Sequence, residues 1–557
     1  MKRRAMIKNL SAIPIAGGLY SFDSIINDPF YSGKLNTGTQ LPGSAEAGAL
    51  SIGPDIFRSI GVEPVINCRG TFTAIGGSTE LPEVRRAMEF AAVSYVQLDE
   101  LAMAVGRRLG EITGAEWGMV SSGCAAGIKH VTTACITGGD PEKLIRIPDL
   151  AGFEKTEVII PAYSRIFYDH AIRNTGARII TVNSPEELSS SISNRTAMIF
   201  LFTGSPGYYE GPLSAENVVA IARRSNIPVF VDAAAEILTI PNIHLQKGAT
   251  IVAYSGGKAI RGPQSAGLLL GKKEILLSAW QASSPHHGPG RDNKVDSEEQ
   301  IGMLAAVETW VRTDHAAKEK TWMSWLKYIS EQISDIKSVR CEIREPEGVD
   351  NRSASMTIIW DPEVLNITGE QVAEDFAKNT PRIAIGCRSD LSAGTTTISV
   401  NAQMMQPGEE KTVAERIRKI LKQKHTPLVN EMEKPADDIT GRWDVIIKFY
   451  NSEAKHELLL DTQEGNWIQG IHLSGFSRQE IAGTIEGSKV RLQSTYTAPG
   501  DSIPFIFAGE MTNDAISGTL YMGEYRTAEF TAIKKNIRKR QSRISIPNYG
   551  RRNPNTW

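Results

Sequence analysis

The run Ala249–Gly271 reads ATIVAYSGGKAIRGPQSAGLLLG, two short apolar segments on either side of a glycine-rich turn that holds one lysine, Lys258. Apolar segments this short are typical of strands that are buried on both faces. A lysine between a buried strand and a Gly-Pro turn is partly removed from water. We expect this desolvation, together with cationic neighbours such as Arg261, to lower the pKa of Lys258. The neutral amine can then attack an aldehyde and form a Schiff base.

A Walker A loop is another possible meaning of a Gly-Lys turn, and the sequence excludes it. That loop requires a glycine five residues before the Gly-Lys pair and a Ser or Thr after it. Val252 and Ala259 occupy those positions.

Two upstream segments place polar groups at the ends of predicted strands. In PVFVDAAAEI, Asp232 ends an apolar run, and SSGCAAG (Ser121–Gly127) joins the run WGMV to a helical segment. Ligands of open α/β sheets bind at the edge where the carboxyl ends of the strands meet. Asp232 is either the N-cap of the next helix or a carboxylate that pairs with a cationic heterocycle. The glycine turn offers free N–H groups to a phosphate or carboxylate, although any strand–helix joint can need such a glycine.

Alternating strand and helix patterns organise most of the chain. They predict an α/β domain with a mostly parallel sheet over residues 52–300. The stretch from 298 to 333 reads as one long helix, and a smaller αβ unit completes residues 301–428. The smaller unit ends in RIAIGCRSD, TTTISVNAQM and the charged helix EEKTVAERIRKILKQK.

The pattern changes near residue 434. Eight short segments, many of them alternating, follow up to residue 535 and are separated by Gly, Asn and Asp turns. They predict an antiparallel β domain that resembles a small closed barrel. His456 and His472 are isolated there, and we interpret them as strand residues rather than ligands. The expected role of this domain is binding or packing.

The ends of the chain have compositions of their own. Residues 1–25 (MKRRAMIKNLSAIPIAGGLYSFDSI) join a basic start to an apolar run that is too short to span a membrane, and they resemble a twin-arginine signal. This predicts export to the periplasm, with a cytoplasmic location as the alternative. Residues 26–51 read as a linker, and residues 536–557 as a basic disordered tail.

The composition limits the possible partners. The 557 residues carry a formal net charge of −2, which gives no electrostatic case for nucleic acid or an anionic membrane. The five cysteines form no CxxC pair, so we expect free thiols and no zinc site.

Together, the SSG turn, the strand-end aspartate and the lysine after SGG resemble the fold type I enzymes that use pyridoxal 5′-phosphate (PLP). More narrowly, they resemble the selenocysteine synthase-like family, which includes L-seryl-tRNA(Sec) selenium transferases and amino-sugar ammonia-lyases. The matching segments span about residues 54–412, and SGGKAIRGPQSAG is the most specific of them. The ammonia-lyase-like members match better than the tRNA enzyme. The resemblance implies a large and a small domain with PLP bound to the large one.

The resemblance also implies roles for individual residues. Lys258 would form the internal aldimine and shuttle the α-proton, and Asp232 would keep the pyridine nitrogen protonated. His170 would stack on the ring or bond its 3′ oxygen. Ser122, Gly123, Cys124 and Ser255 would hold the phosphate, Arg382 the substrate carboxylate, and Asn67, Arg69 and Thr71 the mouth of the substrate site. The stretch GRDNKV departs from the family at Asp292 and Asn293, which puts its substrate contacts in doubt.

The implied activity is α,β-elimination with ammonia release from a hydroxy-amino acid or an amino-sugar acid. Racemisation, transamination and selenium transfer stay open as alternatives, as does a non-catalytic secreted scaffold. A homodimer or larger assembly is expected. We expect neither nucleic acid as a partner nor a membrane span.

Overall fold

The computed structural model describes residues 49–390, 393–428 and 431–535. The chain divides into two compact units. The first unit contains the residues up to Leu428 and also the short segment Thr497–Ser502, and the second unit contains the other residues from Val429 onward. The predicted signal segment, nearly all of the predicted linker and the basic tail lie outside the described residues. No helix in the described ranges is both long and apolar enough to cross a membrane.

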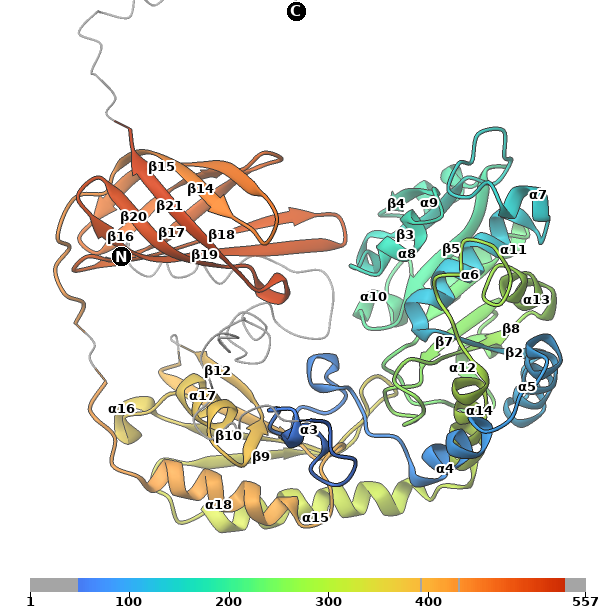
Figure 1. Ribbon diagram of the computed structural model, residues 1–557, viewed down its shortest axis with the longest axis horizontal. Coiled ribbons are helices and arrows are strands. Elements are labelled where there is room, and N and C mark those ends of the chain that lie inside the picture. The colour runs from blue at the N-terminus through green and yellow to red at the C-terminus, as the bar shows by residue number, and fades with distance from the viewer. Residues whose placement is uncertain (1–48, 391–392, 429–430, 536–557) are drawn as a thin grey trace, which may run out of the picture. The chain divides into compact units, whose positions relative to one another are not determined.

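A seven-stranded sheet forms the centre of the first unit, in the order β2-β8-β7-β6-β5-β3-β4 (Figure 1). Every strand runs parallel to the others except β8, which is antiparallel to both of its neighbours. The strands are β2 (Trp117–Ser121), β3 (Glu157–Pro161), β4 (Arg178–Val182), β5 (Thr196–Phe202), β6 (Val229–Asp232), β7 (Ile251–Ser255) and β8 (Gly267–Gly271). The predicted mostly parallel sheet is confirmed.

Helices cover both faces of this sheet. Alternate side chains of the central strands therefore lie in two different hydrophobic cores, one on each face. Phe200 and Phe230 stack with ring centroids 5.8 Å apart on one face, where α6 and α13 pack. Ile199 and Val231 lie on the other face, with α5, α11 and α14. The helices are α3 (Ile56–Ser59), α4 (Pro82–Ala91), α5 (Leu98–Thr113), α6 (Gly123–Thr137), α7 (Pro141–Leu144), α8 (Asp169–Arg173), α9 (Pro185–Ser191), α10 (Pro206–Tyr209), α11 (Ala215–Arg224), α12 (Ile243–Gln246), α13 (Lys273–Gln281) and α14 (Ser297–Arg312).

The small part of the first unit is built on a four-stranded antiparallel sheet in the order β12-β13-β10-β9. Its elements are α15 (His315–Ile333), β9 (Arg340–Arg344), β10 (Ser355–Trp360), α16 (Pro362–Leu365), α17 (Gly369–Lys378), β11 (Arg382–Ala384), β12 (Gly386–Asp390), β13 (Thr395–Asn401) and α18 (Glu409–Lys422). Strand β1 (Val65–Asn67), from near the start of the described chain, pairs in parallel with β11. The segment INCRGTFT is therefore tied to the small part.

The long helix predicted over residues 298–333 is wrong, because two helices, α14 and α15, occupy this stretch. The first helix ends at Arg312, and Asp314 caps the second, since its carboxylate accepts a hydrogen bond from the backbone N–H of Ala317. Met303 and Ala306 of α14 lie in the core of the large sheet. The predicted boundary at residue 300 falls inside this helix.

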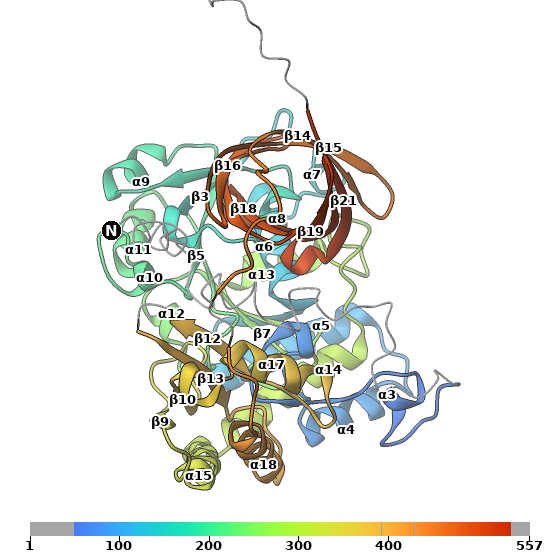
Figure 2. The ribbon, with the colours of Figure 1, turned by 90° about the vertical axis from the view of Figure 1, so that its left-hand side faces the viewer.

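The second unit is a closed eight-stranded antiparallel barrel, β14 to β21 in sequence order, with β21 paired to β14 (Figures 1 and 2). The predicted β barrel is confirmed. Its strands are β14 (Gly441–Lys448), β15 (Glu453–Glu464), β16 (Trp467–Leu473), β17 (Arg478–Glu486), β18 (Lys489–Ala498), β19 (Asp501–Thr512), β20 (Ala515–Tyr521) and β21 (Thr527–Lys534). His456, His472 and Ser494 form a buried hydrogen-bonded chain inside it, through contacts of 2.8 and 2.7 Å.

Candidate active site

The carboxyl ends of β2, β6 and β7 lie at the same edge of the large sheet, because these three strands run parallel. Ser121 ends β2, Asp232 ends β6 and Ser255 ends β7. The turn that carries Lys258 follows β7. The structure thus brings the anion turn, the aspartate and the lysine of the sequence analysis to one edge.

Asp232 is a buried carboxylate with an unused oxygen. Its side chain is 1 % exposed; Oδ1 accepts a hydrogen bond of 3.1 Å from the N–H of Ala234, and Oδ2 has no partner among the described residues. Burial raises the pKa of Asp232 to about 6, and the Ala234 hydrogen bond and the charge of Lys258 oppose this rise. A buried, unpartnered carboxylate oxygen needs a partner, and a protonated ring nitrogen supplies one.

Lys258 stands half-buried in a tightly closed turn. The N–H of Gly256 donates to Ala266 O and that of Gly262 to Gly256 O, both at 2.8 Å. Within the described part of the chain, the Lys258 amine has no hydrogen-bond or ion-pair partner, so it is free to react.

The flanking RGPQ residues hold a neighbouring loop instead of reaching Lys258. Arg261 adopts a positive φ of 56°, and its Nε and Nη2 donate to Thr79 O and Oγ1, both at 2.8 Å. The N–H of Leu81 donates to Arg261 O at 3.1 Å. The side-chain amide nitrogen of Gln264, when it faces the Gly76 carbonyl, donates to Gly76 O at 2.9 Å. The proposed influence of Arg261 on the pKa of Lys258 stays a prediction.

The anion turn precedes α6, whose first residue is Gly123 with a φ of 76°. A Cβ at Gly123 would meet no atom closer than Ser265 O at 4.0 Å, whereas a Cβ at Gly267 would lie 2.6 Å from the Gly123 carbonyl carbon. The turn is therefore open on its outer side and packed directly on β8. Burial and the charge of Asp232 raise the pKa of the Cys124 thiol, and the charge of Lys258 opposes this.

The predicted substrate residues on the small part make structural contacts. Asn67 accepts from the Arg69 N–H at 2.8 Å and donates to Gly70 O at 2.9 Å, while Thr71 is buried. Arg382 is 9 % exposed, and its Nε donates to Ala377 O at 2.6 Å. Their roles toward a substrate stay predictions.

Three further residues singled out in the sequence have the following surroundings. His170 projects from α8 with a side chain that is 59 % exposed. Asp292 binds Lys129 of α6 at 2.7 and 2.9 Å, and Asn293 accepts from the same amine at 3.2 Å. The two residues at which the sequence departs from the family therefore both bind a buried lysine of this chain.

The sequence analysis missed a polar network just beyond Asp232. Glu236 is 1 % exposed, and its two carboxylate oxygens lie 2.6 Å from the Tyr209 hydroxyl and from Nε2 of His244. The other ring nitrogen of His244 lies 2.5 Å from the Tyr208 hydroxyl. In the sequence, the one indication of this network is Glu236 itself, a charged residue that follows three alanines in DAAAEI.

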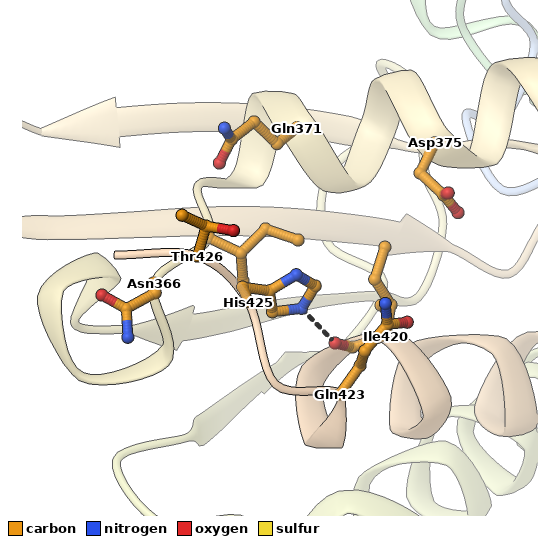
Figure 3. Close-up of a pocket in the computed structure, with 8 residues that line it drawn as sticks. Asn366, Gln371, Asp375, Ile420, Gln423, His425 and Thr426 are labelled. Carbon is orange, nitrogen blue, oxygen red and sulfur yellow. Dashed lines mark hydrogen bonds between the residues drawn. The ribbon is translucent and has the colours of Figure 1, made fainter. Parts of the chain in front are cut away.

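A surface pocket of about 330 Å³ lies elsewhere, in the small part of the first unit (Figure 3). It lies between α17, α18 and the segment after α18, where His425 Nε2 contacts Ile420 O at 2.7 Å. None of the predicted catalytic or cofactor-binding residues lines it, so we assign it no catalytic role.

The residues at the sheet edge fit PLP. The unpartnered Oδ2 of Asp232 suits the ring nitrogen, the free amine of Lys258 suits the aldehyde, and the open turn at Gly123 suits the phosphate. The sheet, the small part and this edge define the class of the protein as a fold type I PLP-dependent enzyme.

Comparisons with known proteins narrow this class. No family model matches the chain. The chain is 30% identical over 305 residues to D-glucosaminate-6-phosphate ammonia lyase of Salmonella typhimurium, covering 53% of this chain and 79% of that protein. It is 26% identical over 377 residues to 5'-C-glycyluridine monooxygenase-decarboxylase of a Streptomyces species, covering 66% and 92%. A solved structure of D-glucosaminate-6-phosphate ammonia-lyase matches 67% of this chain and 99% of its own, with 27% identity and a TM-score of 0.59.

The chain therefore belongs to the selenocysteine synthase-like family of PLP-dependent enzymes, which includes the amino-sugar ammonia lyase.

Proposed function

We propose that the protein binds PLP through Lys258 and Asp232 and eliminates a β-hydroxyl from a hydroxy-amino acid or an amino-sugar acid, with release of ammonia and a 2-keto product. The observation that carries this proposal is the buried, unpartnered Oδ2 of Asp232 at the same sheet edge as the free amine of Lys258. The name of the Salmonella relative supports ammonia release as the reaction.

The residues of this chain divide the work. PLP, when bound, supplies a sink for the electron pair of the Cα–H bond. The Lys258 amine would take the α-proton of the substrate at Nζ and then deliver a proton to the departing β-hydroxyl, which leaves as water; a water molecule later replaces the amino group, which leaves as ammonia. The Asp232 carboxylate accepts a hydrogen bond from a cationic nitrogen, and burial strengthens that interaction. Backbone N–H groups of Ser122, Gly123 and Cys124 hold the phosphate at the start of α6.

Other reactions compete for the same residues. A racemase, an aminotransferase or a selenium transferase-like enzyme needs the same lysine and aspartate. The Streptomyces relative, a monooxygenase-decarboxylase by name, shows that reactions differ widely among related proteins. A homodimeric assembly, the twin-arginine export route and a periplasmic location are parts of the proposal that rest on the sequence alone.

The first test is the visible absorbance of purified protein to which PLP has been added. Wild type is expected to show the band of a PLP–lysine conjugate, and Lys258→Ala is expected to lose it. Lys337→Ala, at an exposed lysine, is the matched control and retains the band. A colourless wild type would overturn the proposal. Assays of ammonia and keto acid then separate elimination from racemisation, since racemisation releases neither.

A further inference from the structure

A loop of the small part is hydrogen-bonded to the backbone just beyond the cofactor aspartate. This bridge loop, Gly348–Arg352, lies between β9 and β10. The N–H of Ile237 donates to Val349 O at 2.9 Å. In the opposite direction, the N–H of Asn351 donates to Ala235 O at 3.0 Å. The two bonds flank one antiparallel residue pair, so they fix both the spacing and the direction of the two segments.

The bridged segment also carries the contacts of Asp232 itself. The N–H of Ala234 donates to Oδ1 of Asp232 at 3.1 Å, which leaves Oδ2 without a partner among the described residues. The carbonyl oxygen of Ala234 accepts a hydrogen bond of 3.3 Å from the N–H of Ser255, at the end of the strand that leads to Lys258. Because Ala234 directly precedes Ala235, the bridge loop holds the residue that orients the Asp232 carboxylate.

A bidentate ion pair fixes the bridge loop to α15. Nε and Nη2 of Arg352 donate to the two carboxylate oxygens of Glu319 at 2.7 and 3.1 Å. Nη1 of the same arginine donates to Gly348 O at 3.2 Å, across the loop. The two side chains are 29 and 24 % exposed, so water screens this pair less than it screens a surface pair. Since two parallel bonds to a planar guanidinium fix its orientation, Arg352 both closes the loop and ties it to a helix.

We propose that Arg352 and Glu319 are positioning residues for the cofactor, which hold the bridge loop so that Oδ2 of Asp232 faces the ring nitrogen of PLP. This inference rests on the proposed function, since it assigns the ring nitrogen to Asp232. A hydrogen bond weakens steeply when its atoms move out of line. A functional group therefore depends on neighbours that hold it within about 0.5 Å of its working position. The small part thus acts on the cofactor, and not only on the substrate side of the site.

Two measurements compare Glu319→Gln, which removes the charge of the pair and keeps the size of the side chain, with wild type. Titration of the cofactor-free protein with PLP, followed by visible absorbance, is expected to give about fivefold weaker binding. PLP that is isotope-labelled at its ring nitrogen reports the protonation of that atom in solid-state nitrogen NMR. In the variant this signal is expected to move toward that of the unprotonated ring. Glu374→Gln, which removes an exposed ion pair with Lys378 on α17, is the matched control and changes neither result.

Substitutions of Asn351 test the bridge by a second route. This residue adopts a φ of 44°. Glycine keeps the N–H and adopts this φ readily, whereas proline has no N–H and holds φ near about −65°. Asn351→Gly is expected to bind PLP within about twofold of wild type. Asn351→Pro is expected to reproduce the nitrogen signal of Glu319→Gln, and if urea unfolding shows that it does not fold, Glu319→Gln decides alone.

Two results would overturn the positioning role. One is a nitrogen signal in Glu319→Gln that equals that of wild type, because a loss of affinity alone would show a merely structural role. The other is an equal change of the signal in Glu374→Gln. Wild type separates the two proposals. If it shows the visible cofactor band and the variants keep its nitrogen signal, only the positioning role is refuted, whereas a missing band in wild type refutes the proposed function as well.

Discussion

Replacing Asp232 by asparagine is expected to remove a pH-dependent cost to the stability of the cofactor-free protein while it weakens cofactor binding. The pKa of Asp232 is raised from 3.8 to about 6, chiefly by burial, in a side chain that is 1 % exposed. Below pH 3.8 the carboxyl is protonated in both the folded and the unfolded chain, and it costs nothing. Between pH 3.8 and 6 the unfolded chain ionises first, so folding becomes less favourable, and above pH 6 the full cost applies.

The size of the stability cost follows from the difference between the pKa of Asp232 in the folded chain and its ordinary value. One pKa unit corresponds to about 1.4 kcal/mol, so ionised Asp232 costs the cofactor-free fold about 3 kcal/mol. The amide of asparagine adds a constant cost of about 1–3 kcal/mol, because its N–H₂ group finds no partner where Oδ2 stood. The quantity to compare is therefore the change in the variant's relative stability with pH.

Urea unfolding of cofactor-stripped wild type and Asp232→Asn, repeated between pH 4 and pH 8, measures this quantity. The free energy of unfolding of the variant is expected to gain about 3 kcal/mol on wild type as the pH rises, with a plateau above pH 7. Glu347→Gln, at an exposed carboxylate, controls for the change of net charge. If the difference in the free energy of unfolding between wild type and Asp232→Asn stays constant from pH 4 to pH 8, the carboxylate is not desolvated in the folded protein. That result would refute the reasoning.

Two other substitutions test the anion turn and the barrel. Gly267→Ala forces a Cβ to within 2.6 Å of the Gly123 backbone and is expected to cost at least about 1–3 kcal/mol in stability and to weaken PLP binding in titrations; Gly475→Ala, in open space, is the control, and equal behaviour of the two would contradict the packing argument. Burial and the charge of His456 lower the pKa of His472 to about 3. Stability contributed by neutral His472 is present above pH 6.5 and is lost as the pH falls toward 3, so the protection of barrel amides against hydrogen exchange, relative to an unstructured peptide at the same pH, should fall on acidification. His472→Gln should remove most of this dependence, and an unchanged dependence would count against it.

The sequence predicts those parts of the fold that local patterns encode. Apolar runs such as AMIFLF predict buried strands because both of their faces meet a helix layer, and the alternating C-terminal segments predict barrel strands because only one face is buried. Gly114 correctly marks the end of α5, since it adopts the left-handed conformation at a φ of 72°. The break between α14 and α15 is missed because the helical periodicity continues across it, although Asp314 is a standard cap.

The sequence cannot predict contacts between distant segments. Nothing local to Asp350 indicates that it faces Glu236, because the bridge depends on how the β9–β10 loop meets the segment after β6. The specific stretch RGPQ was informative about the family, but its contacts with Thr79 and Leu81 depend on tertiary structure. Asp232 and Lys258, by contrast, are predictable as a pair because the carboxyl ends of parallel strands share an edge.

The pairing of β1 with β11 has a consequence for how the chain assembles during synthesis. Residues 65–67 leave the ribosome long before residues 382–384, with the whole large sheet encoded between them. Because a strand cannot pair before its neighbour exists, the segment Asn67–Thr71 has to wait unpaired while the large sheet forms. Translation therefore completes the sheet edge around Lys258 before the segment Asn67–Thr71 can pair with the small part.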